Sequence, residues 1–135
     1  MIYYVDTSFL LLALLDQEGR AEAERVLQEG ADEEALVSSA LLEVELKQIA
    51  SRAGLPGPAI DNALAEVELF SVDMVLREAG IVPGPIKTLD AVHVATAMAL
   101  DSPLAPVVVL THDRRMAACA RRCGLEVVDV PGRST

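Results

Sequence analysis

Short apolar runs alternate along the chain with longer segments whose apolar residues recur every three or four positions. The short runs are rich in β-branched and other apolar side chains, which is typical of buried strands. They predict strands at residues 2–5, 36–38, 69–72, 107–110 and 126–130. The longer segments predict helices at residues 8–15, 20–29, 39–53, 57–68, 74–80, 88–101 and 113–123.

This alternation of strands and helices predicts a parallel sheet with helices on both faces. The stretches "RAGLPGP" and "GIVPGPI" interrupt the helical segments, because Gly and Pro do not continue a helix comfortably. No repeat or long linker divides the chain, so we expect one domain over residues 1–135. The expected fold is α/β, a three-layer α/β/α sandwich with a central parallel sheet. Ligands of such sheets bind beyond the carboxyl ends of the strands.

The composition is that of an ordinary globular protein, with 52% hydrophobic and 24% charged residues. The apolar run "SFLLLALL" is shorter than the roughly 18 residues of a membrane span, and no basic residue precedes Arg20 as a signal peptide would require. We therefore expect a cytoplasmic protein without membrane contact, in which this run is either core or part of an apolar groove. Cys119 and Cys123 are expected to be reduced thiols, because a metal site would need more Cys or His nearby.

The net charge of −10 disfavours a broad electrostatic attraction to nucleic acid. The charge is uneven, however: residues 16–34 are strongly acidic, whereas Arg114, Arg115, Arg121 and Arg122 lie together on one predicted helix. These arginines are equally consistent with phosphate contacts and with a solvated helix face carrying ordinary surface pairs. An enzyme acting on nucleic acid needs only a local basic contact, so the total does not exclude one.

Asp6 and Asp113 each follow an apolar strand and precede a helix. Both are therefore candidates for helix N-caps, whose side chains accept from free backbone N–H groups. Both are also candidates for a site at the carboxyl end of the sheet. Asp73, after "FSV", has the same appearance and is interpreted only as a cap.

Two further carboxylates occupy helix positions that should be apolar. On a helix of ~100° per residue that starts at Leu41, Glu45 falls at about 40°, inside the apolar stripe. Glu43 falls at about 200°, where it can pair with Lys47 on the exposed face. Asp90 begins a helix that is apolar nearly all round, and Thr88 could supply its cap, which leaves Asp90 for another role.

The sequence thus offers four candidate acids, Asp6, Glu45, Asp90 and Asp113. Such anions would repel one another in a partly desolvated cleft unless a cation neutralised them. Oxygen ligands without Cys or paired His suit Mg²⁺ or Mn²⁺. These ions activate water and stabilise phosphoryl charge in hydrolysis.

Four segments carry a resemblance to a known family: "YVDTS", "SSALLEVEL", "LDAVHVATA" and "LTHDRRMAACARRCGLEVV". In this order, over about residues 2 to 130, they resemble the PIN-domain ribonucleases and most closely the VapC toxins of bacterial toxin–antitoxin pairs. The resemblance implies a PIN-like sandwich whose acidic cleft binds Mg²⁺ or Mn²⁺ and cleaves RNA. It also implies a homodimer and inhibition by a cognate antitoxin protein.

Carried over by motif, the four catalytic acids are again Asp6, Glu45, Asp90 and Asp113, of which Asp6, Asp90 and Asp113 are the implied metal ligands. Ser8 and His93 are assigned supporting roles, His93 because no second histidine accompanies it as a ligand. Substrate contacts are assigned to Thr111, Arg114 and Arg115. Lys87 stands where the family often has Arg, so its contact with substrate or partner is left open.

The sequence therefore predicts a metal-dependent endoribonuclease, the toxin of a toxin–antitoxin module. A receiver domain would usually show adjacent acids after its first strand, and a haloacid-dehalogenase-like phosphatase would have Asp at position 8. Thr7 and Ser8 follow Asp6 instead. The alternative that stays open is a PIN-like protein- or RNA-binding module with a vestigial nuclease site.

Overall fold

The computed structural model describes residues 1–129 and contains a five-stranded parallel sheet. Its strands lie in the order β3-β2-β1-β4-β5. They are β1 (Ile2–Val5), β2 (Leu36–Ser39), β3 (Glu68–Phe70), β4 (Val107–Thr111) and β5 (Glu126–Asp129). All five predicted strands are present, and the predicted end of the last one, Val130, lies outside the described residues.

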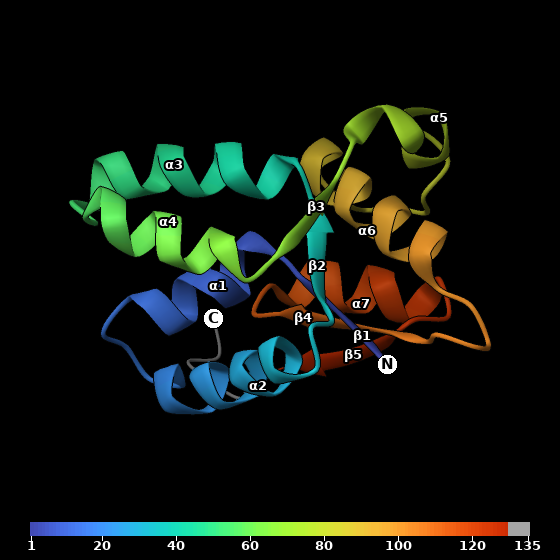
Figure 1. Ribbon diagram of the computed structural model, residues 1–135. Helices are drawn as coiled ribbons and strands as arrows, with labels where there is room; N and C mark the ends of the chain where they lie inside the picture. The colour runs from blue at the N-terminus through green and yellow to red at the C-terminus, as the bar shows by residue number, and fades with distance from the viewer. Residues whose placement is uncertain (130–135) are drawn as a thin grey trace.

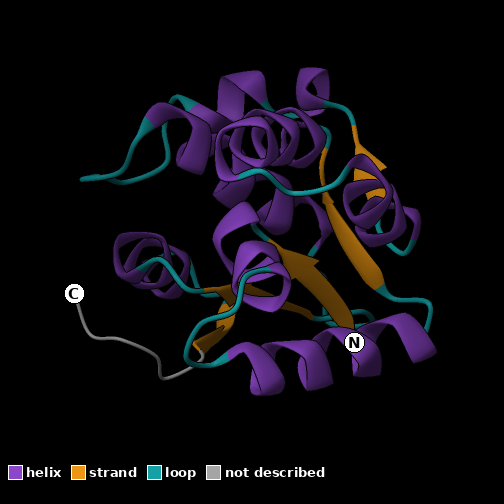
Figure 2. Cartoon of the chain, turned by 90° about the vertical axis from the view of Figure 1, so that its left-hand side faces the viewer, coloured by secondary structure: helices purple, strands orange, loops and turns teal. Residues whose placement is uncertain are grey.

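Helices surround the sheet, as Figures 1 and 2 show. They are α1 (Thr7–Leu14), α2 (Arg20–Asp32), α3 (Leu41–Ala53), α4 (Gly57–Ala65), α5 (Leu76–Ala79), α6 (Thr88–Leu100) and α7 (Arg114–Arg122), with a 3₁₀ turn at Val72–Met74. Within residues 1–129 no helix has both the length and the apolar composition needed to cross a membrane.

Two apolar cores, one on each face of the sheet, hold these layers together. Successive side chains of a strand point to opposite faces, so Val5 of β1 packs with α1 to α4 while Tyr4 packs with α6 and α7. In β4, Val108 and Leu110 face the first core, and Val107 and Val109 face the second. The expected α/β/α sandwich is confirmed.

The segment after β3 differs from the prediction. The strand ends at Phe70, and Val72 already belongs to the 3₁₀ turn. Ser71 caps this turn by accepting a hydrogen bond from the Asp73 backbone N–H at 3.2 Å. The interpretation of Asp73 as the cap is therefore wrong, because the hydroxyl two residues earlier already fills that role.

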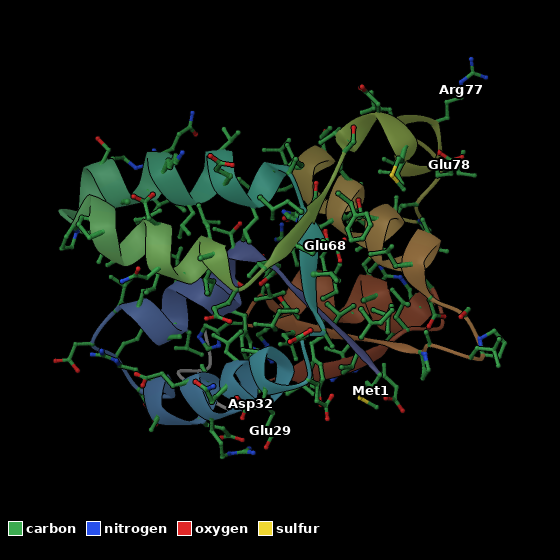
Figure 3. The ribbon with its side chains drawn as sticks, in the orientation of Figure 1. Met1, Glu29, Asp32, Glu68, Arg77 and Glu78 are labelled. Carbon is green, nitrogen blue, oxygen red and sulfur yellow. The ribbon has the colours of Figure 1, made fainter. Side chains whose placement is uncertain are left out.

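The acidic segment forms the outer face of α2. Arg20 pairs with Glu24 and Arg25 pairs with Glu29 one turn further along, at 2.7 Å in both cases. Figure 3 shows Glu29 and Asp32 on the outer side of this helix. The charge of this segment therefore faces solvent.

The order in which the strands are added to the sheet reverses at β1, in the centre of the sheet. From β1 the chain builds outward through β2 to β3, and β4 then returns to the other side of β1. The carboxyl ends of β1 and β4 consequently meet, with Val5 opposite Leu110. This is the switch point at which open parallel sheets bind ligands, and Asp6 and Asp113 follow these two strands.

Candidate active site

Asp6 combines the two roles that the sequence left open. Its Oδ1 accepts from the Phe9 backbone N–H at 3.0 Å, which caps α1, and from the Ser8 hydroxyl at 2.8 Å. Its Oδ2 accepts from the hydroxyl of Thr111, the last residue of β4, at 2.6 Å. Only 4% of Asp6 is exposed. The cap thus fixes a buried carboxylate at the switch point.

Burial raises the pKa of Asp6 above its ordinary value. The hydrogen bonds from Thr111, Phe9 and Ser8 favour the ionised form and oppose this effect, as does the positive charge that His93 would carry in its protonated form. Desolvation is the larger influence, so the folded protein disfavours the ionised Asp6 carboxylate in the absence of a cation.

Asp113 also caps a helix, because its Oδ1 accepts from the Met116 N–H at 3.0 Å. Two hydroxyls link this turn to Asp6. The Thr111 hydroxyl accepts from the Asp113 N–H at 3.0 Å, and the Ser8 hydroxyl accepts from the His112 N–H at 2.9 Å. Ser8 thus bonds both to Asp6 and to the turn before Asp113, and its supporting role stays a prediction.

Thr111, the last residue of β4, is buried beside two of the acids. It is 0% exposed, and its hydroxyl is already used by Asp6 and Asp113. These bonds give Thr111 a supporting position beside both acids, and its contact with substrate stays a prediction.

Glu45 points inward from α3, as its helical position predicted. Its Oε1 accepts from the Thr7 hydroxyl at 2.8 Å and lies 2.7 Å from Nε2 of His93. Glu43 instead pairs with Lys47 at 2.6 Å on the exposed side. Burial alone would raise the pKa of Glu45, but its contacts with His93 and Thr7 together lower it.

Asp90 is the third residue of α6, and no hydrogen bond to its carboxylate occurs within residues 1–129. Burial raises its pKa, and the negative charges of Asp113 and Glu45 add to this effect. The charge of Lys87, and that of His93 in its protonated form, oppose it. The expected cap by Thr88 is wrong: Lys87 occupies the cap position without a side-chain bond, and Thr88 is already helical.

The four acids line one pocket of about 400 Å³, although they come from four separate segments of the chain. They share it with Thr7, Ser8, Leu11, Ile49, Lys87, Thr88, Leu89 and His93. The oxygen-only donors and the raised pKa of Asp90 fit a hard cation. No three His, Cys, Asp or Glu side chains of residues 1–129, however, are arranged to hold a metal ion as they stand.

A second pocket of about 420 Å³ adjoins the first and shares Ser8, Lys87, Asp90 and Asp113 with it. Arg114, Arg115 and His112 complete its lining. The arginine cluster is therefore divided, since Arg122 donates to the Pro83 carbonyl at 3.4 Å and Arg121 lines neither pocket.

Comparison with known proteins shows the family of this chain. The family model for the PIN domain matches residues 3–122. This chain belongs to the PIN-domain family. Ribonuclease VapC35 of Mycobacterium tuberculosis, found in strains CDC 1551 / Oshkosh and H37Rv, is 32% identical over 137 residues, or 99% of each chain. Ribonuclease VapC46 of strain H37Rv is 34% identical over 95 residues, covering 68% of this chain and 72% of the relative.

The predicted resemblance to PIN-domain proteins of the VapC type is thus confirmed. Sequence reasoning missed two residues that bond to side chains of the pocket, Tyr4 and Thr7. Thr7 stands directly beside Asp6 in "VDTS", so its position was a usable signal. From the sequence, Tyr4 is recognisable only as a strand residue. Its hydroxyl bonds to His93, which lies 89 positions further along the chain.

Substituting Asp6 tests the effect of burying a carboxylate. Because its folded pKa is raised, the native state binds this proton more tightly than the unfolded chain, and its contribution to the free energy of unfolding falls as pH rises through the raised pKa. Asn keeps the cap, so we expect metal-free Asp6→Asn to be more stable than the parent at pH 7. Urea unfolding at several pH values measures this difference; a less stable Asn variant would contradict it.

Substituting Asp113 separates its cap from its charge. Asn retains an acceptor for the Met116 N–H, so Asp113→Asn should change the free energy of unfolding by less than about 0.5 kcal/mol, whereas Asp113→Ala should lose about 1 kcal/mol. Both variants remove the negative charge beside Asp90 and should lower the Asp90 pKa. Carbon-13 NMR titration of the Asp90 carboxyl group measures the shift, and an unchanged pKa in both variants would refute the repulsion.

Proposed function

We propose that this PIN-domain protein is a metal-dependent endoribonuclease and the toxin of a toxin–antitoxin module. The observation that carries the proposal is the convergence of Asp6, Glu45, Asp90 and Asp113 on one pocket at the switch point of the sheet. The names of the relatives, Ribonuclease VapC35 and Ribonuclease VapC46, support the choice of RNA as the substrate.

Asp6, Asp90 and Asp113 are the proposed ligands of Mg²⁺ or Mn²⁺, with Glu45 completing the site. When bound, such an ion supplies an activated water and neutralises charge on the phosphate. Mg²⁺ sites commonly use one or two carboxylates and fill the remaining positions with water and substrate phosphate.

The residues around the acids have different roles in the proposed site. Ser8, Thr111 and the N-terminus of α1 hold Asp6 in place through hydrogen bonds. Asp90, which accepts no hydrogen bond within residues 1–129, has its full acceptor capacity for a cation. The apolar side chains of Leu11, Ile49 and Leu89 limit water around the reacting phosphate.

Phosphate contacts are proposed for the second pocket, through Lys87, Arg114 and Arg115. Arg20 and Arg25 of α2 and Lys47 of α3 are engaged in ion pairs. Lys87 and Arg115 form no ion pair within the described part of the chain. Positive charge therefore remains at the edge of the acidic pocket, where a polyanion would need it despite the net charge of −10.

Protein partners are part of the proposal through the VapC-type relatives: a second copy of the chain and a cognate antitoxin. Exposed apolar side chains support a protein partner, among them Met74, Leu76 and Ile81 on and around α5. Figure 3 shows the neighbouring Arg77 and Glu78 directed away from the body of the molecule. A cytoplasmic location belongs to the same proposal.

A second candidate is a PIN-like module that binds RNA or protein with a vestigial nuclease site. The specific observation in its favour is that no three donors of residues 1–129 stand ready to hold a metal ion. Direct Mn²⁺ binding separates the two candidates, because the nuclease requires it and the binding module does not.

Cleavage of RNA by the purified, antitoxin-free protein tests the proposal. A mixed RNA pool should be cut with Mn²⁺ and left intact with EDTA. Asp6→Asn, which preserves the cap of α1, should reduce cleavage roughly 100-fold or more. Asp73→Asn is the matched control, since this acid is exposed on a helical turn and does not line the pocket. Cleavage that survives EDTA or Asp6→Asn would refute the metal-dependent mechanism.

The salt dependence of RNA binding tests the phosphate contacts. Binding of a labelled RNA in EDTA, where cleavage is prevented, should weaken with salt, and each lost contact should reduce the logarithmic slope by about 0.7. We expect this change for Lys87→Gln and for Arg115→Gln. Arg20→Gln on α2 serves as the control and should leave the slope unchanged. Equal slopes in all three variants would remove Lys87 and Arg115 from the substrate contacts.

A further inference from the structure

A line of buried polar side chains runs from the sheet to the acidic pocket. The hydroxyl of Tyr4 on β1 lies 2.8 Å from Nδ1 of His93 on α6. Nε2 of the same imidazole lies 2.7 Å from Oε1 of Glu45 on α3. Tyr4 is 0% exposed and His93 is 1% exposed, so both bonds lie out of bulk water.

The proton positions along this line follow from donor and acceptor capacity. An ionised carboxylate only accepts, so Nε2 of His93 must carry the proton that points at Glu45. In the neutral imidazole, Nδ1 then accepts the proton of the Tyr4 hydroxyl. The hydroxyl of Thr7 donates to the same Oε1 of Glu45 at 2.8 Å. With this one orientation of the His93 ring, Tyr4, His93 and Glu45 all have hydrogen-bond partners.

The two donors act on only one oxygen of Glu45. Oε1 accepts from Thr7 and His93, whereas Oε2 has no hydrogen-bond partner within residues 1–129. Glu45 lines the acidic pocket together with His93 and Thr7. The anchored oxygen thus fixes the carboxylate and leaves Oε2 for a ligand of the pocket.

The line also joins two helices that share β2 as a neighbour but otherwise pack on different elements. α3 packs mainly against α1, α4 and β2, whereas α6 packs mainly against α5, α7 and the sheet. The bond between His93 and Glu45 connects them at the pocket. On α6 the residues adjacent to His93, Val92 and Val94, are buried and apolar, so core packing alone does not require an imidazole at this position.

We propose that Tyr4 and His93 are positioning residues that hold Glu45 in the orientation needed at the acidic pocket. This inference rests on the proposed nuclease function of that pocket. His93 acts through Glu45 and does not touch the substrate, and Tyr4 acts through His93 by fixing its ring. Partners of this kind typically change metal affinity or activity 10- to 100-fold when they are lost.

The orientation of the ring is measured without any activity. Long-range ¹H–¹⁵N NMR of the metal-free protein at neutral pH reports which ring nitrogen of His93 carries a proton. His112→Gln assigns the signals, because the chain has 2 histidines. We expect a proton on Nε2, and a ¹⁵N shift at Nδ1 in Tyr4→Phe that is absent from Tyr3→Phe, the same change on the same strand. An unprotonated Nε2 would overturn the proposal.

Kinetics of the folded variants distinguish positioning from general stabilisation. His93→Leu, which has no donor, should lower kcat for RNA cleavage roughly 10- to 100-fold with KM changed less than about threefold. His93→Gln keeps an N–H donor at a similar reach and should recover most of kcat. Val94→Ala is the control for lost packing, because Val94 is also fully buried on α6 but has no hydrogen-bonding side chain and lines neither pocket.

A double-mutant cycle shows whether His93 acts through Glu45. In the Glu45→Gln background, His93→Leu should add little further loss, because the group that it positions is already altered. The same fold loss in both backgrounds would overturn the proposal. If the parent protein neither binds Mn²⁺ nor cleaves RNA, the proposed function fails instead, and the ¹H–¹⁵N measurement still decides whether His93 directs its proton at Glu45.

Discussion

The parallel pairing of β1 with β4 is the constraint on which the site depends. It brings residues about a hundred positions apart to the same edge of the sheet, so that the backbone N–H of Asp6 donates to the Leu110 carbonyl and the Thr111 hydroxyl reaches the Asp6 carboxylate. α3 and α6 then add their acids from the helical layers. A shift in this central register would separate the acids of α1 and α7 while leaving each helix intact.

The pocket brings together carboxylates whose ionised forms the surrounding protein partly disfavours. Burial disfavours the ionised form of Asp6, and neighbouring carboxylates disfavour that of Asp90. Glu45 is the exception, because Thr7 and His93 stabilise its charge. The site therefore holds one carboxylate whose charge the protein itself stabilises and two whose charge it disfavours. Natural proteins commonly accept such local instability where a site needs it.

The sequence predicted the layers because apolar periodicity reports burial directly, and it predicted the inward side of Glu45 for the same reason. It failed at Asp73 and Thr88 because a neighbouring residue, Ser71, supplied the cap in one case and no side chain did in the other. Capping depends on backbone dihedral angles that differ by a single residue along the chain. The bond from Tyr4 to His93 was beyond sequence reasoning, because it requires the strand order and the rotation of α6 together.

The use of Asp6 and Asp113 as helix caps has a consequence for how such chains diverge. A cap tolerates Asn or Ser nearly as well as Asp, whereas a cation site does not. A lineage that no longer needs the acids is therefore free to exchange them for amides or hydroxyls while its helices still begin at the same residues. A descendant that has lost the activity but still folds would carry Asn, Ser or another neutral cap at these two positions. A descendant that has lost the fold would not need to keep a capping residue there at all.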